Sequence, residues 1–129
     1  MVMAMSSVCM AANDGTDLNR QQKVVDRFME VLGAVDNSGY VQLKNDFVPD
    51  LQQQITAGKF EEMRQQMRNN FGIVQEVRFV AYERFDQGDR LTYLANYSRQ
   101  QIVRLVYNFD IAGKITEFLF VPLEVKQQQ

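Results

Sequence analysis

The hydrophobic pattern of this chain changes its period at Gly72, and this change limits the folds open to it. Before Gly72, apolar residues recur three or four positions apart, as in helices that bury one face. After Gly72, apolar and polar residues alternate, and β-branched and aromatic residues are frequent, which favours strands. Helices followed by consecutive strands indicate an α+β domain, because the helices must cover the apolar face of the sheet.

Four helical segments are expected before Gly72. They span residues 17–33 or 17–36, 40–47, 49–55 and 59–70. Thr16 or Asp17 is the expected N-cap of the first segment, whose apolar positions include Phe28 and Val35. Pro49 suits the first turn of the third segment, since its fixed φ and missing N–H cost nothing there, and Gly72 is the expected stop after the fourth.

Four strands are expected after Gly72. They span residues 73–85, 90–98, 101–109 and 114–121. The connections at residues 86–89 and 110–113 carry Asp and Gly, the residues that tight turns favour, so neighbouring strands should form antiparallel hairpins. We therefore predict N-terminal helices packed on one face of a curved four-stranded antiparallel sheet.

The two ends of the chain differ from this pattern. The first 16 residues are small, apolar and Met-rich and become polar at Asn13. Such a composition is typical of a processing segment, so residues 1–12 are predicted to be the end of a signal peptide; a disordered extension or a lipid anchor at Cys9 are the alternatives. We expect one domain over residues 17–125, a polar tail at 126–129, and export to the periplasm or cell exterior, with the cytoplasm as the alternative.

Composition excludes several classes of function. A net charge of -2 gives no reason to expect nucleic-acid binding, which needs clustered Lys and Arg. Histidine is absent and Cys9 is the single cysteine, so the commonest general base, the commonest metal ligand and any internal disulfide are missing. We therefore expect no catalytic residues, metal or cofactor. No segment is apolar for long enough to predict an integral membrane helix in the mature chain.

Four stretches of the chain also carry a resemblance to a known family. They are the Phe-Met-Glu-Val-Leu run at residues 28–32, residues 40–47, Phe71-Gly72, and residues 106–115 with their Asp-x-x-Gly-Lys turn. Together they resemble an uncharacterised bacterial domain family of the nuclear transport factor 2-like (cystatin-like) fold, over roughly residues 17–123. The resemblance implies a cone of helices wrapped by a bent sheet, in extracytoplasmic or lipoprotein-borne domains that sometimes precede a hydrolase domain. It brings no catalytic residues.

Enzymes of this wider fold place carboxylates, tyrosines or histidines inside the cone, where they transfer protons on hydrophobic ring substrates. The matching residues here are Asp46 and the strand tyrosines Tyr82, Tyr93, Tyr97 and Tyr107. A buried carboxylate with a raised pKa beside a phenolic hydroxyl is what such chemistry requires. The alternative is structural: the tyrosines pack as strand aromatics, and Asp46 stays solvated or caps a helix.

Arg104 interrupts the most apolar strand, between Val103 and Leu105. If it points into the cone, it needs a carboxylate partner or an anionic ligand, because an unpaired buried charge is costly. Otherwise it belongs to a solvated outer face, together with the other charged residues of the strands.

Aromatic residues in the strands suggest that both faces of the sheet are covered. Those that do not fit a single face are Tyr82, Tyr93, Tyr97, Phe118 and Phe120. A sheet that is apolar on both faces needs a second covering layer, so we expect a homodimer through the sheet, as the family resemblance also implies.

The leading functional hypothesis is a noncatalytic domain that binds a small apolar ligand or a partner protein. One alternative is an isomerase or dehydratase-like enzyme that uses Asp46 with a tyrosine. Another is an accessory dimerisation domain without a ligand. An enclosed cavity beside Asp46 would favour the enzyme, an apolar cavity the ligand-binding domain, and a filled cone an interaction role.

Overall fold

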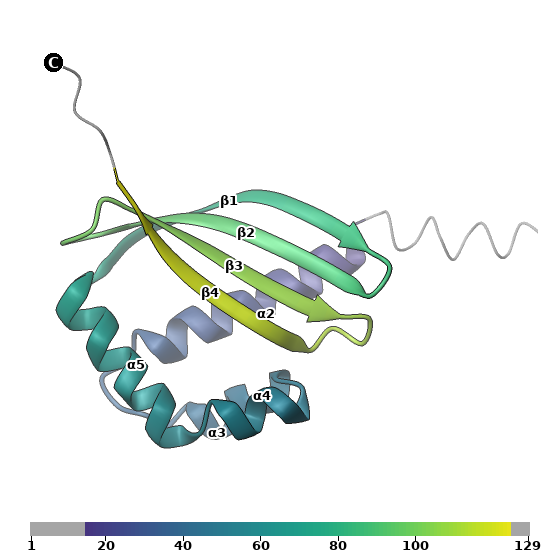
Figure 1. Cartoon of the computed structure of the whole chain (residues 1–129), viewed down its shortest axis with the longest axis horizontal. Coiled ribbons are helices and arrows are strands. Elements are labelled where there is room, and N and C mark those ends of the chain that lie inside the picture. The colour runs from purple at the N-terminus through teal and green to yellow at the C-terminus, as the bar shows by residue number, and fades with distance from the viewer. Residues whose placement is uncertain (1–14, 125–129) are drawn as a thin grey trace, which may run out of the picture.

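The computed structural model describes residues 15–124, in which helices cover one face of an antiparallel sheet (Figure 1). The helices are α2 (Thr16–Leu32), α3 (Tyr40–Leu43), α4 (Pro49–Gln54) and α5 (Ala57–Asn70), with a short 3-10 turn, η1 (Lys44–Asp46), after α3. The strands are β1 (Val74–Phe85), β2 (Gly88–Tyr97), β3 (Ile102–Asp110) and β4 (Ile115–Leu123). They lie in chain order, and each pairs antiparallel with the next. This confirms the predicted α+β class and four-stranded antiparallel sheet. The predicted signal peptide and polar tail lie outside the described residues.

The helix ends differ from the prediction in detail. The N-cap of α2 is Gly15, rather than Thr16 or Asp17. Helix α5 begins at Ala57, two residues earlier than expected, because the Thr56 hydroxyl accepts a hydrogen bond from the Lys59 N–H at 3.3 Å. Gly72 follows α5 with a φ of +87°, and its N–H donates to the Met67 carbonyl, as predicted for a helix stop.

Gly88 allows a close approach between β2 and β3. Pairing of β1 with β2 continues as far as Phe85 and Gly88, so only Asp86 and Gln87 form the turn. A Cβ atom on residue 88 would come within 1.8 Å of the Phe109 carbonyl oxygen. Glycine is therefore required there on steric grounds.

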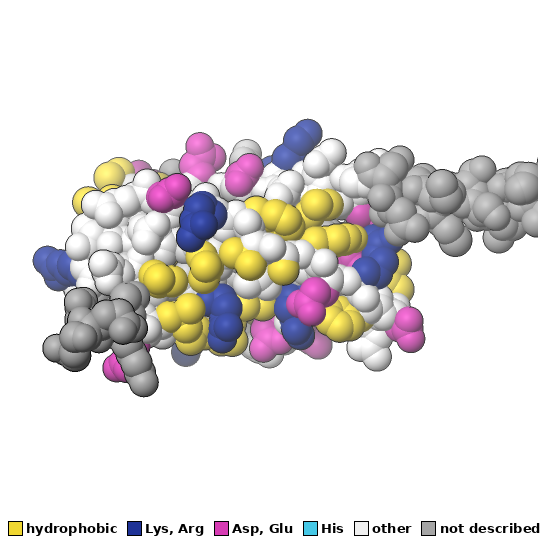
Figure 2. All heavy atoms as spheres, turned by 90° about the horizontal axis from the view of Figure 1, so that it is seen from above, with side chains coloured by type: hydrophobic (Ala, Val, Ile, Leu, Met, Phe, Trp, Pro, Cys, Tyr) yellow, Lys and Arg dark blue, Asp and Glu magenta, His cyan; other side chains and the backbone are white. Residues whose placement is uncertain are grey.

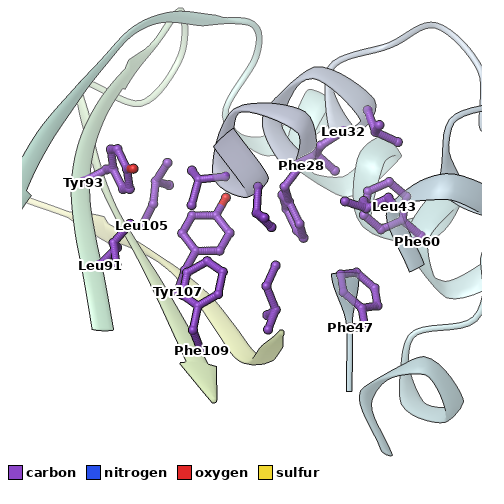
Figure 3. Close-up of a cluster of buried hydrophobic side chains, with 14 of the residues drawn as sticks. Phe28, Leu32, Leu43, Phe47, Phe60, Leu91, Tyr93, Leu105, Tyr107 and Phe109 are labelled. Atoms are coloured by element: carbon purple, nitrogen blue, oxygen red, sulfur yellow. The ribbon is translucent and has the colours of Figure 1, made fainter. Parts of the chain in front are cut away.

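The space between the helices and the sheet is filled by aromatic and aliphatic side chains. Phe28 of α2 is fully buried, and its ring centroid lies 5.7 Å from Phe60, 5.2 Å from Tyr107 and 4.8 Å from Phe118. Figure 3 shows Phe28 between the sheet residue Tyr107 and the helical residue Phe60. Helix α2 thus contributes the central ring of the core, and burial of these rings is a large favourable term in folding.

A β-bulge in β1 changes which side chains share a face. Phe79 pairs with Tyr93, but Ala81 pairs with Thr92, so Val80 is one extra residue in β1. Phe79 and Tyr82 therefore both point to the covered face, although three positions separate them. The five aromatic residues expected on two faces all pack toward the helices: Tyr82, Tyr93, Tyr97, Phe118 and Phe120. That expectation is wrong. Ordinary alternation places the aromatic residues of β2 on one face and those of β4 on the same face, and Tyr82 lies opposite the buried Leu91.

Candidate functional site

Asp46 lies at the end of η1 and forms an ion pair. Its Oδ2 accepts a hydrogen bond from the Arg27 Nε at 2.8 Å, and this bond raises the pKa of Arg27. Within residues 15–124, no tyrosine hydroxyl is hydrogen-bonded to Asp46. The structure therefore does not bring together the carboxylate and the phenol that the enzyme hypothesis combines.

Tyr93, Tyr97 and Tyr107 are all buried on the covered face of the sheet. The Tyr107 hydroxyl donates to the Met29 Sδ at 3.1 Å, while the buried Tyr93 hydroxyl makes no hydrogen bond of normal geometry in the described part of the chain, although the nearby Gln22 side chain acts to lower its pKa. Burial raises the pKa of Tyr93 and of Tyr97 to about 12, and that of Tyr107 well above its ordinary value. All three hydroxyls are consequently neutral at physiological pH.

Tyr82 belongs to a separate polar cluster around Asp89, which the sequence pattern had placed in a turn. Asp89 is buried, and its Oδ2 accepts hydrogen bonds from Tyr82 Oη and Gln21 Nε2, both at 2.9 Å. Arg84 donates to both carboxylate oxygens of Asp89 at 3.1 Å and to Asp17 Oδ2 at 2.7 Å. The cluster therefore fastens the start of α2 to the β1–β2 hairpin.

The electrostatics of this cluster indicate a structural role. Burial by itself would raise the pKa of Asp89, but the hydrogen bonds from Arg84, Gln21 and Tyr82 outweigh it and lower that pKa. The same interactions, first the bond to Asp89 and then the bond to Asp17, raise the pKa of Arg84. A carboxylate held ionised by several donors is a poor proton acceptor at neutral pH.

The outer face of the sheet, opposite the helices, carries a continuous row of polar side chains across all four strands. This polar row consists of Glu83, Arg90, Asn108 and Glu117, which lie opposite one another in register. Arg90 Nη1 lies 3.8 Å from Glu83 Oε1, and Arg90 Nε donates to Asn108 Oδ1 at 3.0 Å. Asn108 Nδ2 in turn donates to Glu117 Oε1 at 3.2 Å.

Two further rows run parallel to the polar row. The apolar row consists of Ala81, Thr92, Val106 and Leu119, and the arginine row of Arg78, Leu94, Arg104 and Val121. Figure 2 shows this face, with apolar side chains along its middle and charged side chains among and beside them. Parts of all three rows line an open hollow of about 460 Å³, and Leu119 is 52% exposed there.

Arg104 is exposed on this outer face, so it needs no buried partner. Neither Arg78 nor Arg104 has a hydrogen bond or ion pair with another of residues 15–124. The arginine row therefore carries two positive charges, whereas the polar row carries two carboxylates and one guanidinium. The polar row is therefore net negative and the arginine row net positive, with a partly exposed apolar row between them, a pattern suited to contact with another surface.

The fold and this surface define the protein as an α+β domain with an open antiparallel sheet and a charge-segregated outer face. No family model, curated protein or solved structure that was compared with the chain matches it. Across the described range, no three Cys, Asp or Glu side chains lie close enough to hold a metal ion. The helices between residues 15 and 124 also include none with the length and apolar character needed to cross a membrane.

Proposed function

We propose that this domain is a noncatalytic interaction domain that pairs with a second copy of itself through the outer face of its sheet. The observation that supports this proposal is the position of the arginine row and the polar row on opposite sides of the apolar row. Such a surface is complementary to itself, as the contact patch of a two-fold symmetric dimer must be.

The charges select one orientation of the two copies. A two-fold axis along the apolar row lays the polar row of one copy over the arginine row of the other. Glu83 then faces the second copy's Arg78, and Glu117 lies near its Arg104. A two-fold axis parallel to the strands would instead set Glu83 against Glu117 and bring the two arginine rows together, which is unfavourable.

Apolar contact supplies the rest of the proposed interface. Leu119 and Val106 form its centre, and Leu94 and Val121 extend the apolar area into the arginine row. Removing these side chains from water favours association, while the charged rows at the sides fix the orientation. The space between the helices and the sheet is filled by Phe28 and its neighbours, which further favours a role exercised at the surface.

Sedimentation equilibrium of the full chain tests this proposal. The unmodified protein should be a dimer, and Arg104→Glu or Glu117→Arg should each raise the dimer dissociation constant by about tenfold or more, equivalent to about 1.4 kcal/mol. The combined variant should recover much of the affinity, because it restores opposite charges. Lys23→Glu makes the same charge change as Arg104→Glu, but on the exposed side of α2, and should leave the dimer dissociation constant unchanged. A monomeric unmodified chain would sink the proposal.

We also propose that the cone is of the nuclear transport factor 2-like type and that the domain is exported. The order of four helical pieces before a four-stranded antiparallel sheet supports the first proposal, and the Met-rich start of the sequence supports the second. N-terminal sequencing of the protein recovered from a bacterial periplasm or medium tests export. A mature terminus near Asn13 is expected, whereas retention in the cytoplasm with an intact Met1 would contradict it.

A further inference from the structure

A second hollow, separate from the outer face, lies where the C-terminal ends of α2 and α5 meet the start of β1. Its volume is about 70 Å³. Its apolar lining comes from Met29 and Leu32 of α2, Met67 of α5 and Val74 of β1, and Tyr97 of β2 completes it. Two helices and two strands thus contribute side chains to one small apolar site.

Tyr97 brings a phenolic hydrogen-bond donor to this hollow. The residue is only 7% exposed, and no hydrogen bond within residues 15–124 uses its hydroxyl. The Phe71 ring packs edge-on against Tyr97 at 5.5 Å and restrains its orientation. Because the Tyr97 hydroxyl still reaches solvent, an acceptor on a bound molecule would take the place of a water at this hydroxyl.

Two arginines line the hollow, and the charge of Arg64 is paired with Glu61, so Arg68 supplies its available positive charge. Arg64 is buried and donates to the carbonyls of Leu32 and Val31, while Arg68 is exposed, and its contact with the Gly33 carbonyl is long, at 3.4 Å. The lining contains no carboxylate. An anionic acceptor is therefore favoured over a neutral one, and Arg68 keeps donors free to bind it.

The volume sets the size of the molecule. A buried water needs about 10–15 Å³ of such space, so 70 Å³ has room for about five to seven non-hydrogen atoms. We propose that this hollow binds a short-chain carboxylate of about four carbons. Its apolar chain lies against Met29, Leu32 and Met67, and its carboxylate accepts hydrogen bonds from Tyr97 and Arg68. This site is independent of the proposed dimer.

Butyrate is the probe for the experiment, and the full chain labelled with ¹³C at its methionine methyls is the reporter. Titration should shift the Met29 and Met67 methyl signals saturably in the millimolar range, as expected for so few atoms, and should leave Met63 unchanged. Met29→Leu and Met67→Leu identify the two signals. Tyr97→Phe and Arg68→Gln should each weaken binding about fivefold or more, whereas Tyr93→Phe should bind normally.

Butanol and butylamine separate the charge from the apolar chain. Butyrate should bind at least several times more tightly than either. Equal binding of butanol would overturn the carboxylate assignment. Absence of saturable shifts with butyrate, or unchanged affinity in Tyr97→Phe, would overturn the site itself.

Discussion

Gln21 of α2 donates a hydrogen bond from Nε2 to Oδ2 of Asp89 of β2 at 2.9 Å, and both side chains are buried. The two residues are 68 positions apart in the sequence. Their contact joins the helical layer to the sheet, and Arg84 and Tyr82 complete the set of donors around the same carboxylate. The stability of the fold should therefore depend on the charge of Asp89.

Replacing Asp89 should lower stability and change its response to acid. Asp89→Asn loses the charge-assisted bonds to Arg84, so the free energy of unfolding at pH 7 should fall by about 1–3 kcal/mol. In the unmodified protein the folded pKa of Asp89 is lowered. The contribution of the Asp89 carboxylate to the free energy of unfolding is therefore complete above its pKa in the unfolded chain, about 3.9. This contribution is lost as the pH falls through the pKa of Asp89 in the folded protein.

Urea unfolding at pH 7 and at successively lower pH values measures both effects. The unmodified protein should lose more stability on acidification than Asp89→Asn does. Asp86→Asn, at an exposed turn position, is the matched control and should behave like the unmodified protein. If Asp89→Asn lost as much stability on acidification as the unmodified chain, Asp89 would not be the group that links stability to pH.

Arg64 should be far more important for stability than its neighbour Arg68. Arg64 is 4% exposed and closes the C-terminal end of α2 through the carbonyls of Val31 and Leu32. Arg64→Met should cost about 2–4 kcal/mol, because several buried acceptors lose their donor. Arg68→Met should change stability by less than about 0.5 kcal/mol, as is usual for surface positions. Chemical denaturation of both variants decides the point, and equal losses would contradict the capping role.

Two tyrosine-to-phenylalanine changes should have different consequences. The Tyr93 hydroxyl is buried and makes no hydrogen bond of normal geometry within residues 15–124, so Tyr93→Phe should be neutral or stabilising by up to about 1 kcal/mol. The Tyr40 hydroxyl donates to the Ile55 carbonyl, so Tyr40→Phe should cost about 0.5–1.5 kcal/mol. Thermal unfolding of the pair gives the comparison. A clear loss in Tyr93→Phe would reveal a partner for that hydroxyl, such as a buried water.

Phe28 should be among the most sensitive positions of the core. It is fully buried and touches rings from the sheet and from α5. Phe28→Ala should cost about 3–5 kcal/mol through lost burial and a residual cavity. Phe85→Ala removes the same ring at a site that is 50% exposed, so its cost should be much smaller. Urea midpoints for the two variants test whether α2 is the central element of the core.

Apolar spacing was sufficient to predict the helical layer and most of its buried face. Phe28 and Leu32 are buried as expected, but Val35 is 88% exposed, because α2 ends at Leu32. The spacing of apolar residues does not predict that the helix ends this early unless the local capping geometry is known. Strand positions were predictable for the same reason, since alternation and Asp-Gly turns are local signals.

The candidate surfaces could not be predicted in the same way. Apolar residues occupy the two positions before Arg104 and the two positions after it, so alternation alone could not assign Arg104 to a face of the sheet. Asp89 and Arg64 look like ordinary turn and helix residues, and only contacts with distant parts of the chain bury them. Their roles depend on tertiary packing, which no local pattern contains.

The bulge at Val80 has a consequence for the length of the chain. Removing Val80 would leave Phe79 followed directly by Ala81 and Tyr82, and regular alternation would then keep Phe79 and Tyr82 on the covered face. A homologue one residue shorter at this point could therefore keep the same pairing. Deleting Thr92 from the unbulged middle of β2 would instead turn every following side chain of that strand over. Loss of one residue should thus be tolerated at the Val80 bulge of β1 and rejected in the segment of β2 that pairs with it.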